Sequence, residues 1–211
     1  MYINISMQDI TMKQYVIDFF KNKSTGRFLE IGADDGGPKD DTEPFWSLVE
    51  KGWSGVYCEP NPISCATLIK NVMPYGDKIK IFNGAIAPTT GIKDFYISME
   101  TGGSSSFHPE WMQQQDFYLP EHTQFPIITK TLTLSSLLDY IGWDFDAISV
   151  DIECKDYEVE EIFNNIDIFK LTNCKLIIME IGTNVLTNRL IQNGFSIDKP
   201  FKDNLFFTKP M

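Results

Sequence analysis

The sequence predicts a single-domain α/β protein built on a mostly parallel β-sheet with helices on both faces. Short apolar runs alternate with segments of helical periodicity along most of the 211 residues, and such alternation implies parallel strands joined by right-handed crossovers. Over residues 28–37 the first apolar run breaks into a glycine-rich turn, and several later runs end in an acidic residue. Because parallel strands bring their carboxyl ends to one edge of a sheet, these features predict a ligand site at that edge.

Composition and charge fit one folded domain over residues 1–211. Hydrophobic residues make up 43% and charged residues 22%, which is ordinary for a globular chain long enough to bury a substantial core. The 18 Lys and Arg residues against 29 Asp and Glu residues give a net charge of −11. Such a field opposes binding to phosphate backbones, so nucleic acid is a poor candidate for the substrate.

The amino terminus and the cysteines indicate a cytoplasmic protein. The first residues have no basic flank followed by a long apolar core, so we expect no signal peptide. No window approaches the roughly 18 apolar residues of a membrane span. The four cysteines are far apart and form no Cys-x-x-Cys pair, which favours buried thiols over zinc or disulfides. The oligomeric state is not predicted.

Periodicity places the elements of the first half. We expect, in order, an amphipathic helix over 7–22, a central strand over 27–32, a helix from Thr42 to Gly52, and a strand over 54–59. Asn61 is expected to cap the next helix and Pro62 to open it. The inward face of that helix is expected to contain Ile63, Ala66, Ile69 and Val72.

The second half contains one long break in the alternation. Residues 100–126 are rich in Gly, Ser, Gln and aromatics, and we interpret them as a lid or substrate-facing insertion. Strands are expected over 79–83, 93–98, 127–134, 147–151 and 176–180, with helices over 135–141, 156–165 and 185–193. Two short strands near 195–197 and 205–208 are expected to form an antiparallel pair at one edge.

The acids of the glycine turn indicate the charge of the ligand. Glu30, Asp34 and Asp35 would repel a pyrophosphate at a helix N-terminus, whereas they would attract an ammonium or sulfonium group. The turn therefore favours S-adenosylmethionine over NAD.

Acids at later strand ends are expected to converge on the same site. Glu59 lies 23 residues beyond Gly36, about the spacing at which an acid accepts hydrogen bonds from ribose hydroxyls. Asp151, Glu153 and Glu180 follow two further core strands. A solvated acid at a strand end would give the same pattern, so the spacing alone leaves that alternative open.

Five sequence blocks resemble the FkbM family of S-adenosylmethionine-dependent methyltransferases. They include Glu-Pro-Asn-Pro at 59–62 and Asp-Ile-Glu at 151–153, and the resemblance runs from about residue 27 to residue 208. It implies a Rossmann-like class I methyltransferase fold with a seven-stranded sheet and an antiparallel last strand. It also implies O-methylation of a hydroxyl on a sugar, glycan or glycoconjugate.

The resemblance also implies roles for individual residues. Glu30 and Gly32 would hold the methionine end of the cofactor, Glu59 the ribose, and the loop of Asn83, Gly84 and Ala85 the adenine side. Further cofactor contacts are expected from Ala33, Asp34, Pro60, Asn61, Ser105 and Ser106.

Removal of the acceptor's proton requires a base, for which Asp151 and Glu153 are the candidates. His108 and His122 lie in the insertion, where a surface position or a place over the pocket are both open. An alternative device is Mg²⁺ held by Asp151 and Glu180, which would orient a sugar diol and lower its pKa.

Two features of the sequence leave the chemistry open. Cys154 stands where the family has glycine after Asp-x-Glu, so the local turn and the placement of Glu153 are uncertain from the sequence. Trp111, Phe117 and Tyr118 would either stack on an acceptor or anchor the insertion. The rival functions are a cofactor-binding protein without catalysis and an NAD-dependent sugar oxidoreductase.

Overall fold

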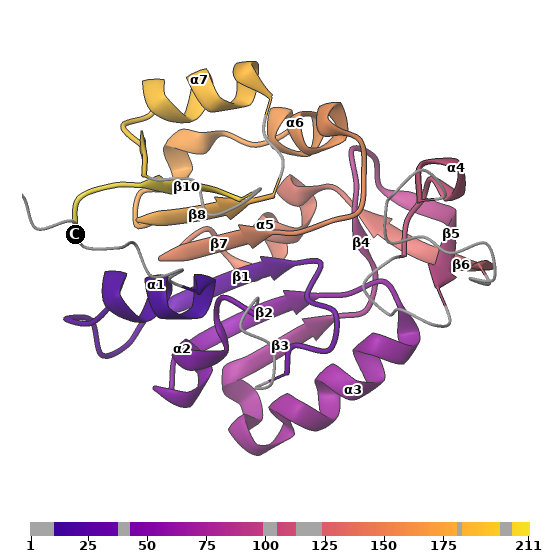
Figure 1. Ribbon diagram of the computed structural model, residues 1–211, viewed down its shortest axis with the longest axis horizontal. Coiled ribbons are helices and arrows are strands. Elements are labelled where there is room, and N and C mark those ends of the chain that lie inside the picture. Colours follow the sequence, from indigo (N-terminus) through magenta and orange to yellow (C-terminus); the bar gives the residue numbers. More distant parts are fainter. Residues whose placement is uncertain (1–10, 38–42, 99–104, 113–123, 181–182, 199–203) are drawn as a thin grey trace, which may run out of the picture.

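The structure is a computed structural model that describes residues 11–37, 43–98, 105–112, 124–180, 183–198 and 204–211. Within these residues, a seven-stranded sheet forms the centre (Figure 1). Its strands lie side by side in the order β3 (Ile79–Phe82), β2 (Ser54–Cys58), β1 (Arg27–Ile31), β7 (Ala147–Val150), β8 (Leu176–Met179), β10 (Leu205–Thr208) and β9 (Ser196–Ile197). The first five are parallel, and β10 is antiparallel to both its neighbours. The predicted α/β class, the central position of β1 and the antiparallel last strand are confirmed.

Helices cover both faces of this sheet, as predicted. One face carries α1 (Met12–Phe19), α2 (Trp46–Glu50) and α3 (Pro62–Val72), and the other carries α5 (Leu134–Ile141), α6 (Asp156–Asn164) and α7 (Asn184–Gln192). Side chains of β1 alternate between the two, because Phe28 packs in the first core while Leu29 and Ile31 pack in the second. The strand is therefore buried on both sides.

A smaller sheet lies beyond the carboxyl ends of the parallel strands (Figure 1). It contains β4 (Ala85–Ile86), β6 (Gln124–Leu132) and β5 (Gly91–Ser98) in that order, with β5 and β6 antiparallel. The short helix α4 (Pro109–Met112) lies beside it, and the 3₁₀ helices η1 (Met73–Lys78) and η2 (Ile168–Lys170) complete the elements. The expected insertion at 100–126 is shorter than predicted at its end, because residues 124–126 already belong to β6.

The predicted inward face of α3 is wrong except at Val72. Ile63 and Ile69 are 52% and 45% exposed, and Ala66 is exposed too; the buried residues are Ser64, Cys65, Leu68 and Val72. Two apolar stripes with helical spacing overlap in this segment, and periodicity does not choose between them. The packing of Leu68 fixes which stripe faces inward. Its side chain lies beneath the glycine turn, where a Cβ on Gly36 would be 2.3 Å away from it.

The first two helices begin later than predicted. Helix α1 starts at Met12, because Thr11 is extended and its side chain accepts a hydrogen bond from the Gln14 amide. Helix α2 starts at Trp46 without a side-chain cap, and Thr42 lies outside the described residues. None of the helices in the described segments is long and apolar enough to cross a bilayer.

Candidate functional site

The glycine turn presses the end of β1 against the end of β7. Gly32 has φ +83°, and a Cβ at this position would lie 1.6 Å from the Asp151 carbonyl oxygen. Only glycine therefore fits at this position. Two residues on, Asp34 also has a positive φ, of 42°, which directs its backbone amide toward the end of β2. The turn thus joins the ends of three strands.

A cavity of about 380 Å³ opens where these strands end, within the usual size for a small-molecule site. Many of the predicted site residues line it: Gly32, Asp34, Glu59, Pro60, Gly84, Ala85, Ser105, Asp151 and Glu153. The remaining predicted residues, Glu30, Ala33, Asn61, Asn83, Ser106 and Glu180, are not on its wall. The structure therefore brings together acids from β1, β2 and β7 and leaves out the one after β8.

Glu59 is fixed by backbone amides of the surrounding loops. Its Oε2 accepts from the Asp34 amide at 2.8 Å and its Oε1 from the Asn61 amide at 2.6 Å. The side chain is 5% exposed, and burial raises its pKa to about 8, although these two amides act in the opposite direction. Each oxygen retains a lone pair beside the cavity, so Glu59 can still accept hydrogen bonds from a ligand.

Asn61 and Asn83 support this wall from behind. Asn61 caps α3 as predicted, with its Oδ1 accepting from the Ile63 amide at 3.0 Å, and its Nδ2 lies 3.3 Å from the Ser105 hydroxyl. Asn83 donates from Nδ2 to the Glu59 carbonyl at 2.9 Å. Both side chains position residues that line the cavity.

Glu30 and Glu43 form a buried carboxyl pair at the inner end of the site. Glu30 is 3% exposed, hydrogen bonds to the Glu43 side chain, and its Oε2 has no partner. Glu43 lines the cavity directly. Burial raises the pKa of both groups; in addition the negative charge of Glu30 raises that of Glu43, and Asp151 acts on both in the same direction.

The loop after β7 carries the two candidate bases. Asp151 and Glu153 both line the cavity, and burial followed by the charge of Asp151 raises the pKa of Glu153 to about 7. Cys154 is buried, and its backbone φ is not positive, since Asp34 is the one non-glycine residue with positive φ in the described part of the chain. The missing glycine therefore imposes no strain at this position.

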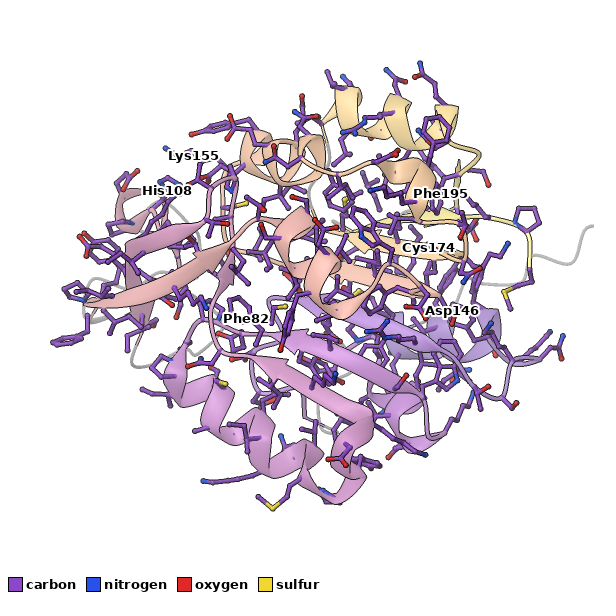
Figure 2. The ribbon with its side chains drawn as sticks, turned by 180° about the vertical axis from the view of Figure 1, so that it is seen from behind. Phe82, His108, Asp146, Lys155, Cys174 and Phe195 are labelled. Atoms are coloured by element: carbon purple, nitrogen blue, oxygen red, sulfur yellow. The ribbon has the colours of Figure 1, made fainter. Side chains whose placement is uncertain are left out.

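Part of the predicted insertion, residues 105–112, returns to the cavity. Ser106 donates its hydroxyl proton to the Glu153 carbonyl, and its oxygen accepts from the His108 amide at 3.1 Å. His108 Nε2 lies 2.8 Å from Glu158 Oε2, at the start of α6. Figure 2 shows His108 and Lys155 side by side at this end of the molecule. His108 is thus held at the edge of the site, whereas His122, Phe117, Tyr118 and the side chain of Trp111 lie outside the described residues.

The structure does not support the predicted magnesium site. Glu180 is absent from the cavity wall. Among the described residues, no group of three or more His, Cys, Asp and Glu side chains is arranged to hold a metal ion. The described residues therefore give no support to a magnesium site formed by the acids at the ends of β7 and β8.

Several cavity residues escaped the sequence reasoning, among them Glu43, Phe95, Phe107 and Glu158. Phe95 lies on β5 and its ring meets that of Phe107 at 5.1 Å, edge to face. The only signal for Glu43 was its position in the loop after the glycine turn, next to Pro44. Nothing in the local sequence distinguishes these residues from other Glu and Phe residues, because contacts between distant segments bring them to the cavity.

Comparison with known proteins identifies the family. The model of the methyltransferase FkbM domain matches residues 30–192. The chain therefore belongs to the FkbM methyltransferase family, as its sequence blocks predicted. A search of curated protein sequences gives no significant match.

Two solved methyltransferase structures are similar to this chain. Methyltransferase FkbM from Methylobacillus flagellatus KT has a TM-score of 0.53 at 13% identity, with 87% of this chain and 44% of that one covered. The S-adenosylhomocysteine-bound methyltransferase PaMTH1 of Podospora anserina has a TM-score of 0.48 at 14% identity, with 94% and 77% covered. This chain thus spans less than half the length of the first protein, and at this identity the first likeness concerns the fold alone.

Proposed function

We propose that this chain binds S-adenosylmethionine in the cavity and transfers its methyl group to a hydroxyl oxygen of a sugar, glycan or glycoconjugate. The observation that carries the proposal is the concentration of carboxyl groups around the site, without a Lys, Arg or His side chain on its described wall. Carboxyl groups surround it at Glu30, Asp34, Glu43, Glu59, Asp151, Glu153 and Glu158. Within the described residues, no Lys, Arg or His side chain lines the cavity. Such a site favours a cationic cofactor and a neutral acceptor over any phosphorylated ligand.

The residues present fit this cofactor at three places. The unpartnered Oε2 of Glu30 and the carboxyl of Glu43 would accept hydrogen bonds from the methionine end. The remaining lone pairs of Glu59 would accept them from ribose hydroxyls. Gly84 and Ala85 line the cavity, and their small size would leave room for a flat base. When bound, S-adenosylmethionine supplies a methyl group activated by a sulfonium.

The chain's own contribution to the chemistry is orientation and removal of a proton. Glu153, whose pKa is about 7, is half ionised near neutral pH and can take the proton of an acceptor hydroxyl. Asp151 lies on the same wall and would orient that hydroxyl by accepting a second hydrogen bond. Phe95 and Phe107 offer aromatic surface for the C–H face of a sugar ring.

The overall charge and the cysteines bear on the acceptor and on the location of the protein. The net charge of −11 supports an acceptor other than nucleic acid. None of the four cysteines is in a disulfide, which supports the cytoplasmic location that we propose.

A binding and transfer assay tests the proposal. S-adenosylmethionine should raise the melting temperature of the protein, NAD should not, and methyl groups should pass from labelled cofactor to neutral glycans but not to phosphorylated ones. Glu153→Gln should bind the cofactor and lose transfer, while Glu161→Gln on the exposed side of α6 should retain both. Stabilisation by NAD alone would indicate an oxidoreductase. Binding of S-adenosylmethionine without transfer across a broad glycan panel would indicate a non-catalytic protein.

A further inference from the structure

Glu30 and Glu43 share a hydrogen bond between two carboxyl groups at the inner end of the cavity. Glu30 points from β1 to the side of the sheet that faces α2 and α3, beside its cross-strand neighbour Tyr57. Glu43 reaches it from the loop before α2 and hydrogen bonds to it. Two carboxyl groups can share a hydrogen bond only while one of them is protonated. The pair therefore holds a proton, and Glu43, which lines the cavity, is the member of the pair that a ligand reaches first.

Unused hydrogen-bond acceptors surround this proton. Glu30 Oε2 is buried and has no partner, and the hydroxyl of Tyr57, which is fully buried, has none either. An unpartnered carboxyl oxygen in the interior costs free energy that a hydrogen-bond donor would recover. Since Glu43 lines the cavity and Glu30 lies directly behind it, a ligand reaching Glu43 also comes near the unpartnered oxygen.

The other groups that face the pair are acidic or neutral. Asp34 and Asp151 act on Glu43 from the glycine turn and from the loop after β7, and Tyr57 faces both carboxyls from β2. No cationic group acts on either carboxyl from the described elements packed around them. A positively charged group of a bound ligand would therefore be attracted to Glu30 and Glu43 and would offset their negative charge.

We propose that Glu30 and Glu43 exchange their shared proton for the α-ammonium group of the cofactor. This inference rests on the function proposed above. The proton leaves Glu43 for the solvent as the ammonium enters, so that one positive charge replaces another and no covalent bond changes. An ammonium group has three N–H donors for the two carboxylates and the unpartnered oxygen, whereas a sulfonium has none. The pair is therefore a receptor for the ammonium rather than for the sulfonium.

Calorimetry with two neutral-sulfur ligands tests the exchange. S-adenosylhomocysteine carries the ammonium, and 5′-methylthioadenosine lacks the whole amino acid part. Titration at pH 6.5 in buffers of different ionisation enthalpy counts the protons released on binding. We expect close to one proton per S-adenosylhomocysteine and none for 5′-methylthioadenosine. Between pH 5.5 and 6.5 the affinity for S-adenosylhomocysteine should rise by up to tenfold, with little change for 5′-methylthioadenosine.

Substitution identifies the group that releases the proton. Glu43→Gln retains a hydrogen-bond donor toward Glu30 but has no proton to release, so it should bind S-adenosylhomocysteine at least tenfold more weakly, without proton release, and 5′-methylthioadenosine as before. Glu161→Gln is the matched control on an exposed site. Equal proton counts for the two ligands in the wild-type protein would overturn the exchange even if Glu43→Gln did not fold. Failure of both ligands to bind would instead overturn the proposed function.

Discussion

Glu59 and Glu153 are both buried carboxyls, but their surroundings suit them to different tasks. Glu59 is held by two backbone amides that leave its orientation fixed. Burial, followed by the charge of Asp151, raises the pKa of Glu153, which makes its carboxylate a stronger base than that of an exposed glutamate. A residue with fixed acceptor oxygens suits recognition of a diol, and a residue with a pKa near neutrality suits proton transfer.

Replacement of Glu59 by alanine should weaken cofactor binding. The substitution removes the acceptors for the ribose hydroxyls and leaves the amides of Asp34 and Asn61 without their partner. We expect a loss of about 1–3 kcal/mol, equivalent to roughly 5–150-fold in the dissociation constant of S-adenosylhomocysteine by calorimetry. An unchanged dissociation constant would show that Glu59 does not contact the cofactor.

The proposed base predicts the pH dependence of turnover. Because Glu153 acts only when ionised and its pKa is about 7, kcat should rise with pH and level off above that value. Glu153→Gln should remove this rise and lower kcat by roughly 10²–10⁴-fold while cofactor affinity changes little. Asp151→Asn should also reduce kcat more than affinity. A wild-type profile that persists in Glu153→Gln would assign the proton to another group.

At the scale of elements, the site depends on how closely β1, β2 and β7 approach one another at their carboxyl ends. Backbone hydrogen bonds from Gly32 and Ala33 to the Cys58 carbonyl, at 2.9 and 3.2 Å, connect the turn to β2. The Asp151 amide donates to the Ile31 carbonyl at 2.9 Å and connects β7 to β1. The acids that follow these strands are placed by the sheet itself.

Gly32→Ala should therefore damage both folding and binding. A Cβ would lie 1.6 Å from the Asp151 carbonyl oxygen in a backbone conformation that alanine rarely adopts. We expect a loss of unfolding free energy on the order of 3 kcal/mol or more, measured by urea denaturation, together with loss of cofactor binding.

Gly91→Ala is the control, because a Cβ there meets no atom within 4 Å and its φ is not positive. Its unfolding free energy should stay within about 0.5 kcal/mol of the wild-type value. If Gly32→Ala lost as little unfolding free energy as Gly91→Ala, the turn would not pack tightly against the end of β7.

Elements with a one-dimensional signal were predictable, and those that depend on distant contacts were not. The apolar runs of β1, β7 and β8 and the cap at Asn61 are local, so the sequence located them within about a residue. The inward face of α3 was wrong, since two stripes have the same period. The separate sheet of β4, β5 and β6 was not predicted, because strand partners are chosen across the chain. Glu43 was missed for the same reason, as only the folded loop brings it to Glu30.

Across the whole molecule, charge is divided between the two ends of the sheet. At the amino ends of the strands, Lys23 pairs with Asp146 at 2.8 Å, and Arg27 pairs with Asp144. Figure 2 shows Asp146 at the end of the molecule opposite His108 and Lys155. At the carboxyl ends, acids gather around the cavity with no cation on its described wall. Among the described residues, ion pairs that serve structure thus lie at the amino ends of the strands, and acids concentrate at the carboxyl ends, where a cationic ligand would bind.

This separation predicts an unusual dependence of stability on pH. In the folded protein the pKa of Glu59 is about 8 and that of Glu153 about 7, whereas both are near 4.3 in an unfolded chain. Between these values the folded state binds more protons than the unfolded state, so the free energy of unfolding should fall as the pH rises from about 5 to 8. The pair of Glu30 and Glu43 acts in the same direction. Urea denaturation should show a decrease on the order of a few kcal/mol over this range.

Saturating S-adenosylhomocysteine should reduce that decrease, because its ammonium group would compensate the buried carboxylates as they ionise. Saturating 5′-methylthioadenosine should leave the fall of the unfolding free energy with pH nearly unchanged, since a ligand without the ammonium stabilises the fold equally at each pH. Comparing the two ligands thus distinguishes stabilisation by binding alone from stabilisation by the positive charge of the ammonium group. A free energy of unfolding that rises with pH in the ligand-free protein would mean that the cavity acids ionise more readily in the folded than in the unfolded state, which would contradict the raised pKa values of Glu59 and Glu153.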